Sequence, residues 1–241
     1  MPKVEVTDGT PGDDVINGGN AQDWINGLGG DDEISGGNQH DVLSGDGDGR
    51  GNDVITGDNG KDVVNGDGGN DDLSGNNGKD KVNGGSGSDK VSGGNGKDHL
   101  TAGPTDNDDS DDVLGPNYLT GGNGKDVIVS SFAFCFEEEE ESDSDDGSDA
   151  DVTVLVCPIS DIMTGGRAPD TFVFFGSHGA DTITDFWKDT IDLTGLQLAN
   201  GFDDLSYANN ADGNVVIDTT EGTITLQGVD ASEVEADMFL F

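Results

Sequence analysis

Aspartate recurs at a fixed spacing through the first hundred residues, and this spacing is the chain's clearest chemical signal. The aspartates lie nine residues apart, with one three-residue insertion, at Asp14, Asp23, Asp32, Asp41, Asp53, Asp62, Asp71, Asp80, Asp89 and Asp98. Because carboxylate oxygens are hard ligands, the expected cation is calcium, ahead of magnesium or manganese. The pattern therefore predicts metal binding along the chain.

Each aspartate follows a glycine-rich stretch and precedes an aliphatic residue by two positions. The clearest copy is Gly93-Gly94-Asn95-Gly96-Lys97-Asp98-His99-Leu100-Thr101. Glycine allows positive φ and lets backbone carbonyls crowd around a metal, so the glycine-rich half predicts a turn. The second half predicts a very short strand with its central side chain facing inward. The expected core residues are Ile16, Ile25, Ile34, Leu43, Ile55, Val64, Leu73, Val82, Val91 and Leu100.

Two nonapeptides are expected to complete one coil, and stacked coils would form two parallel sheets about 4.8 Å apart per coil. Each turn then lies over the turn two repeats later, which pairs their carboxylates. Without a cation the paired carboxylates repel, whereas calcium between them, with glycine carbonyls, completes a site of about six oxygens. The expected pairs are Asp14/Asp32, Asp23/Asp41, Asp32/Asp53, Asp41/Asp62, Asp53/Asp71, Asp62/Asp80, Asp71/Asp89 and Asp80/Asp98.

The repeated pattern G-G-x-G-x-D-x-aliphatic-x resembles the RTX (repeats-in-toxin) family. This resemblance implies an all-β fold: a calcium-loaded parallel β-roll solenoid of Gly- and Asp-rich nonapeptides. Ala21 and Gln39 depart from the second turn glycine, so these turns are expected to bind more weakly. The insertion at 46–50 is expected to be a solvated loop; the alternative, an EF-hand start, would have Arg50 at a ligand position.

Composition sets the balance between order and disorder. The formal net charge is −41, from 51 acidic residues against 10 Lys plus Arg, and 31% of residues are apolar. This composition is typical of a disordered chain, which we expect to describe the metal-free state. The charge repels nucleic acid and anionic lipid. No apolar run approaches a membrane span, and no signal-peptide region opens the chain, so it is expected to be cytosolic or exported by a route that does not read the N-terminus.

The period breaks after Leu100. An acidic loop is expected from Pro104 to Asp112, and either Asp112-Val113-Leu114 or Asn117-Tyr118-Leu119 occupies the next coil before a clear repeat returns at 121–128. Two apolar runs, 127–136 and 152–159, predict a strand pair. The acidic tract between them, 137–151, is expected to be a solvated loop, with a low-affinity cation store as the alternative. Cys135 and Cys157 flank this tract as a disulfide or as free thiols.

Three degenerate repeats follow, around Asp161, Asp170 and Asp181, and aromatic residues replace small aliphatics. A stack of coils needs its end covered, so a larger aromatic core that includes Trp187 predicts a C-terminal β cap. The segment resembles the C-terminal domains of RTX proteins and serralysin-type proteases, on the stretches 181–186, 192–196 and 224–229. By that resemblance the last residues, 237–241, are an uncleaved signal for type I secretion; a final strand is the alternative, and both can be true.

These patterns divide the chain into a lead-in (1–8), a β-roll (9–129), a strand pair with an acidic loop (130–160) and a cap with the secretion signal (161–241). About eight or more calcium ions are expected. The predicted ligands are the ten aspartates above with Asp126, Asp170 and Asp181, and the turn glycines Gly12, Gly30, Gly60, Gly69, Gly78, Gly87 and Gly96.

Catalysis is not expected. The sequence has no H-E-x-x-H and no G-x-S-x-G motif, and repeats that begin at Gly9 leave no room for a preceding catalytic domain. His40, His99 and His178 are expected to be surface turn residues. We therefore expect a secreted calcium-binding protein with a structural or binding role. The alternatives are an accessory module that binds extracellular polysaccharide, within an adhesin or a larger enzyme, and, least favoured, a hydrolase.

Overall fold

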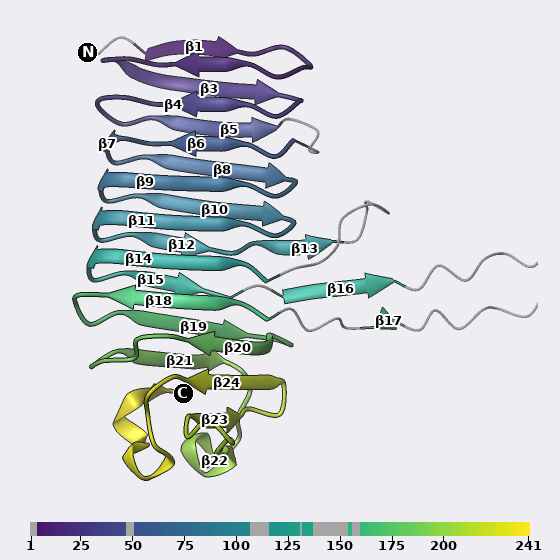
Figure 1. The fold of residues 1–241 in the computed structure, drawn as a ribbon, viewed down its shortest axis with the longest axis vertical. Helices are drawn as coiled ribbons and strands as arrows, with labels where there is room; N and C mark the ends of the chain where they lie inside the picture. Colours follow the sequence, from purple (N-terminus) through teal and green to yellow (C-terminus); the bar gives the residue numbers. More distant parts are fainter. Residues whose placement is uncertain (1–3, 47–50, 107–115, 131, 137–153, 156–159) are drawn as a thin grey trace, which may run out of the picture.

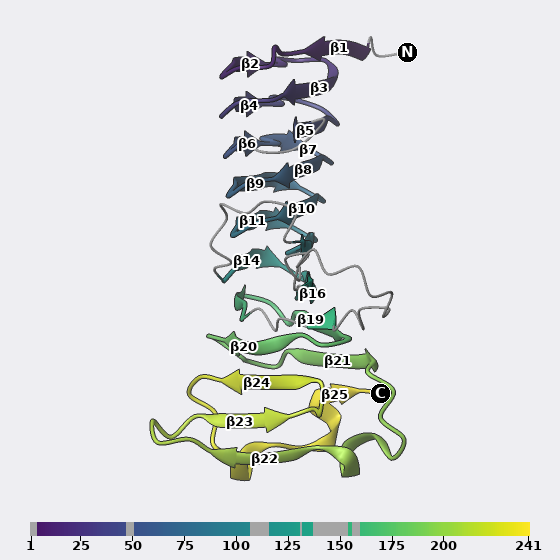
Figure 2. The same cartoon turned by 90° about the vertical axis from the view of Figure 1, so that its right-hand side faces the viewer.

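The computed structural model describes residues 4–46, 51–106, 116–130, 132–136, 154–155 and 160–241. The described chain winds as a flattened coil, one short strand on each side per turn, from β1 at one end to a cap at the other (Figure 1). Figure 2 shows the two stacks of strands edge-on, joined by turns. The all-β parallel roll expected from the repeats is therefore confirmed.

Ten described strands form one sheet, and all neighbours in it are parallel. In spatial order they are β1 (Val4–Asp8), β3 (Gln22–Leu28), β5 (Val42–Asp46), β8 (Val63–Gly68), β10 (Lys81–Ser86), β12 (His99–Thr101), β15 (Val127–Val129), β19 (Thr171–Phe175), β21 (Thr190–Gly195) and β25 (Phe239–Leu240).

Twelve described strands form the facing sheet, which is parallel except at its capped end. They are β2 (Val15–Asn17), β4 (Glu33–Ser35), β6 (Val54–Thr56), β9 (Asp72–Gly78), β11 (Lys90–Gly96), β14 (Tyr118–Gly124), β18 (Ile162–Gly166), β20 (Gly179–Ile183), β24 (Gly222–Leu226), β23 (Val215–Asp218), β22 (Ser206–Asn209) and, beside β9, β7 (Asn59–Gly60).

The register shows that two nonapeptides make one coil. Trp24 pairs with Val42, eighteen residues on, whereas Val42 pairs with Val63 because the insertion lengthens that coil. Ile34 nevertheless aligns with Ile55 across the insertion, so the added residues leave the inward positions in phase. The strands on both sides of the insertion therefore keep their alignment with the neighbouring coils.

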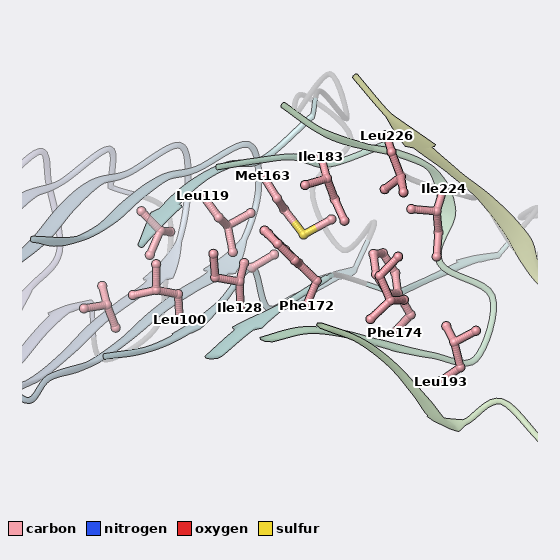
Figure 3. Packing of buried hydrophobic residues seen from close by; sticks show 14 of the residues in the cluster. Leu100, Leu119, Ile128, Met163, Phe172, Phe174, Ile183, Leu193, Ile224 and Leu226 are labelled. Atoms are coloured by element: carbon pink, nitrogen blue, oxygen red, sulfur yellow. The ribbon is translucent and has the colours of Figure 1, made fainter. Parts of the chain in front are cut away.

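The core is a thin double row of aliphatic side chains between the sheets. Nine of the ten expected core positions are buried, and Ile16, in the edge strand β2, is partly buried because no further coil covers it. Towards the cap the row changes from Leu100, Leu119 and Ile128 to Met163, Phe172 and Phe174 (Figure 3). Larger side chains therefore fill the core towards the cap.

The structure shows which repeat remnant occupies the coil after Leu100. Leu119 is buried and pairs with Val91, so Asn117-Tyr118-Leu119 occupies the coil. The other remnant, 112–114, lies outside the described residues. Beside the roll, β13 (Pro104–Asp106) runs parallel to β16 (Phe132–Phe136), which pairs antiparallel with β17 (Val154–Leu155). The acidic tract, residues 47–50 of the insertion and Cys157 also lie outside the described residues, so a disulfide and free thiols both stay open as alternatives.

The C-terminal end is capped by β22, β23 and β24, which pair antiparallel, and by β25, which adds to the opposite sheet. Three 3-10 turns accompany them: η1 (Gly201–Asp204), η2 (Ala231–Glu233) and η3 (Ala236–Met238). Trp187 was expected in this core, but its side chain is 59% exposed and lies under the Lys188 ammonium, 4.5 Å from the ring centroid. No helix among the described residues is long and apolar enough to cross a membrane.

Candidate metal centre

The turn aspartates form two carboxylate ladders, one along each edge of the roll. In the second ladder each rung's backbone amide donates to Oδ1 of the next rung at 2.8–2.9 Å. Its rungs are Asp23, Asp41, Asp62, Asp80, Asp98, Asp126, Asp170 and Asp189. The first ladder repeats this bond at most of its steps, with rungs Asp14, Asp32, Asp53, Asp71, Asp89, Asn117, Asp161 and Asp181.

The other carboxylate oxygen is buried at most of the aspartate rungs. In the second ladder, Oδ2 receives no hydrogen bond from any described residue at Asp41, Asp62, Asp80, Asp98, Asp126 and Asp170. Burying a carboxylate oxygen without a partner costs free energy, because the group loses its water. These oxygens therefore require either a proton or a cation.

Burial shifts these carboxyls toward the protonated form. It raises the pKa of Asp62 to about 7, and the neighbouring carboxylates of Asp80 and Asp41 add to the rise. Burial also raises the pKa of Asp170 to about 6, again with a contribution from the next rung, Asp126. The rise shows that negative charge in the metal-free ladder is unfavourable, since both burial and like charges oppose it.

Glycine leaves a space lined by oxygen beside each of these carboxylates. A side chain at Gly75 would lie 2.7 Å from Asp80 Oδ2 and 2.9 Å from the carbonyl oxygen of Gly93, one coil further on. A side chain at Gly78 would meet the carbonyl of Gly60 and lie 2.7 Å from Asp80 Oδ1. Substitution at either glycine would fill the space where carboxylate and carbonyl oxygens converge.

The donors around this space fit calcium. They are carboxylate and carbonyl oxygens, the hard ligands that calcium takes in sets of six to eight. Among the described residues no three His, Cys, Asp or Glu side chains come together as a metal cluster. A calcium ion held here would therefore take most of its ligands from turn carbonyls and water, and the ladder carboxylates would supply the charge.

Comparison with known families identifies the repeat. A family model, the RTX calcium-binding nonapeptide repeat, matches in four copies at residues 8–43, 48–73, 74–109 and 105–132, which together span about half of the chain. The chain belongs to this RTX family. RTX repeats bind calcium in a structural role, and they are not catalytic in themselves.

The RTX chain also resembles solved structures. One is the extracellular lipase LipA from Serratia marcescens, at 17% identity and a TM-score of 0.32, with 90% of this chain and 42% of the lipase covered. The RTX chain thus spans less than half of that lipase's length, and the similarity is too low to transfer a function. No curated protein matches the chain.

The structure brings together all eight carboxylate pairs expected from the spacing, and it adds Asp126 and Asp170 to the second ladder. At the open end the arrangement is incomplete: Asp14 accepts from the Thr10 hydroxyl at 2.8 Å, and a side chain added at Gly12 would meet nothing within 4 Å. The turn glycines Gly30, Gly60, Gly69, Gly78, Gly87 and Gly96 each lie against the backbone of the neighbouring coil.

The structure adds three rungs that are not among the predicted ligands. Asn117 and Asp161 belong to repeat remnants, whereas Asp189 lies outside the predicted repeats. The signal for Asp189 is present, because Asp189-Thr190-Ile191 has the aspartate-to-aliphatic spacing. The preceding turn, 186–188, contains no glycine, so the glycine pattern does not point to it.

His178 contacts the carboxyl group at the last rung of the first ladder, Asp181. It was expected on the surface, but it is fully buried, with Nδ1 2.9 Å from Asp181 Oδ2 and Nε2 2.8 Å from Thr219 Oγ1. The Thr219 hydroxyl donates to the carbonyl of Gly222 at 3.0 Å, so Nε2 carries the proton toward Thr219. Burial lowers the pKa of His178 to about 4 and raises that of Asp181 to about 9. The pair is therefore neutral at pH 7.

We expect His178→Ala to lower the free energy of unfolding of the calcium-loaded protein by about 2–4 kcal/mol, because it leaves a cavity and removes the partners of Asp181 and Thr219. Urea unfolding followed by near-UV circular dichroism measures this loss. His99→Ala is the matched control, since His99 begins strand β12 with an exposed side chain. Equal stability of the two variants would show that His178 does not secure the cap.

Proposed function

We propose that the chain is a secreted RTX protein that remains unfolded at cytosolic calcium and folds outside the cell when calcium fills the two ladders. Its role is structural or binding, without catalysis. The observation that carries this proposal is the row of buried carboxylate oxygens that no described residue satisfies. Above the pKa values of these carboxyls, they stabilise the roll only when a cation neutralises them, so calcium binding then contributes the free energy of folding.

The ligands that we assign are the ladder aspartates from Asp23 to Asp170 and the carbonyls of the turn glycines, in about eight or more sites. Asp14 lies at the open end and Asp181 already contacts His178, so both are weaker candidates than the interior rungs. Export is supported by the family, whose repeats are typical of secreted proteins. Near the C-terminus, Phe239–Leu240 form β25 in the cap. The proposal also includes a role for residues 237–241 as a type I secretion signal.

A calcium titration followed by far-UV circular dichroism and small-angle scattering tests this function. We expect an expanded chain at submicromolar calcium and a compact roll with a midpoint of roughly 10⁻⁴ to 10⁻³ M, the range of extracellular calcium modules. Magnesium at the same concentration should be much less effective, because it dehydrates reluctantly and demands strict octahedral geometry. A roll that persists after exhaustive chelation at neutral pH, or a midpoint below micromolar calcium, would contradict folding outside the cell.

A further inference from the structure

Half of the chain's basic residues line one groove. Lys61, Lys79, Lys97 and Lys125 each precede a rung of the second ladder, and with Lys81 they line a groove of about 440 Å³. All five lysines are exposed. Since the chain has only 10 Lys plus Arg against 51 acidic residues, five in one groove is a local concentration of positive charge on a strongly negative molecule.

The four lysines that precede ladder rungs, Lys61, Lys79, Lys97 and Lys125, form a lysine column. Ion pairs with carboxylates of the described residues do not account for it. In the described part of the chain, no ion pair joins any of the four column lysines to a carboxylate, whereas Lys90, outside the groove, lies 3.8 Å from Asp72 Oδ2. The carboxylates nearest in sequence, Asp80 and Asp98, are buried in the ladder, where Oδ1 accepts a backbone amide. The ammonium groups therefore face solvent.

The two edges of the roll differ in how the turn amides are satisfied. Along the first ladder's edge, turn side chains accept hydrogen bonds from backbone amides of the next coil. The backbone amide of Asn52 donates to Asp31 Oδ1 at 2.8 Å, and that of Ser88 donates to Asn70 Oδ1 at 2.8 Å. A lysine side chain has no acceptor. The amides of Lys79 and the later column lysines cannot be satisfied in this way, so this edge is rich in donors.

A row of amides accompanies the lysines. Asn20, Asn38, Asn59, Asn77, Asn95 and Asn123 form a ladder in which each side-chain nitrogen donates to the preceding rung's oxygen at 2.8–3.2 Å. One N–H and one oxygen lone pair remain on each interior rung after these bonds. In the four N-G-K turns the asparagine precedes the lysine by two residues, and both side chains are exposed.

We propose that the lysine column and the asparagine ladder together bind a linear carboxylated polysaccharide along the roll. Lysines one coil apart, about 4.8 Å, match a straight polymer that carries a negative charge on each unit. The spare amide groups suit the hydroxyls of the same sugars. Among the described residues that line the groove, His99 is the one ring, and there is no Phe, Tyr or Trp. Single-stranded nucleic acid sites stack successive bases on several aromatic side chains, so a sugar polymer is favoured over nucleic acid.

Binding should depend on the metal, and in this respect it rests on the proposed function. Asp80 and Asp98 also border the groove, and their carboxylates oppose an anionic ligand unless a cation neutralises them. Charges beyond the Debye length of about 8 Å at physiological salt are screened, so the occupied ladder matters more than the distant net charge. The calcium-loaded roll is therefore the form expected to bind.

Calorimetry with short oligogalacturonates tests the inference. The calcium concentration is about 1 mM, the upper end of the midpoint range expected for folding. We expect binding that weakens with added salt, and Lys79→Gln/Lys97→Gln should weaken it at least about tenfold. The matched control is Lys90→Gln/Lys188→Gln, which removes the same charge outside the groove. Neutral oligosaccharides of equal length should not bind, and single-stranded DNA should bind less tightly than the oligogalacturonate.

Three outcomes overturn the assignment: no binding by the parent chain, unchanged binding by the groove variant, which would indicate calcium bridging to carboxylates, and preference for DNA. Circular dichroism of every protein with and without calcium separates this inference from the proposed function. A roll that folds with calcium yet fails to bind refutes only the groove. A roll that needs no calcium refutes the proposed function, while the comparison of the two lysine variants still decides the groove.

Discussion

At pH 4 the metal-free chain is expected to form the roll, whereas at pH 7.5 without calcium it is expected to be expanded. The pKa values of Asp62 and Asp170 in the folded chain, about 7 and about 6, lie above the ordinary value of 3.8. The folded state therefore binds more protons, and its stability is present below pH 4 and lost as the pH rises through 6 to 7. Far-UV circular dichroism of dilute protein in EDTA, read across this range, measures the transition.

General charge repulsion also weakens at low pH, and a matched pair of variants separates the two causes. Asp62→Asn/Asp80→Asn/Asp98→Asn places a neutral amide where the ladder needs a proton, so metal-free folding should extend to higher pH. Asp72→Asn/Asp203→Asn/Asp212→Asn removes the same charge from exposed positions. If both variants shift the transition equally, the ladder carboxylates do not control it.

Replacement of a single ladder carboxylate should have the opposite effect once calcium is present. Asp80→Asn keeps the shape of the side chain and an oxygen that accepts the amide of Asp62, now 2.8 Å from Asp80 Oδ1. It removes the charge at Oδ2, and calcium sites weaken as ligand charge is lost, so we expect the calcium midpoint for folding to rise about tenfold or more. Calcium titration by circular dichroism and calorimetry measures the midpoint and the number of ions.

Asp80 bonds to the rungs on both sides, Asp62 and Asp98, so two neighbouring sites should be disturbed together. Asp72→Asn is the control, because its exposed carboxylate faces only Lys90 at 3.8 Å and such surface pairs contribute little. An unchanged midpoint in Asp80→Asn, or an equal rise in Asp72→Asn, would show that the ladder does not hold the metal.

The two predictions describe one balance. The same carboxylates oppose folding when they are charged and empty, and they favour it when a cation lies among them. Substitution by asparagine should therefore stabilise the metal-free roll and make the protein less responsive to calcium. The acidic composition is compatible with a compact fold because the buried carboxylates of the described residues lie in two ladders that a cation can neutralise.

Much of the roll could be predicted from the sequence because each repeat encodes its own half coil. A nine-residue period sets which aspartates stack, and one aliphatic per repeat sets the core, as for Ile34 and Ile55. The pairing of Asp41 with Asp62 follows from this period even across the insertion, since the strands that flank the insertion keep their alignment.

Only the tertiary structure decided what happens where the period fails. Asn117 bonds to Asp161, 44 residues away, and His178 meets Thr219 across 41 residues, so no local pattern specifies either contact. The same holds for the exposure of Trp187. The sequence by itself determined the repeating coil, its carboxylate pairs and the stacking of the lysines that precede them, because these depend on neighbours at a constant spacing. Hydrogen bonding and burial between distant segments decided the cap and the closing rungs.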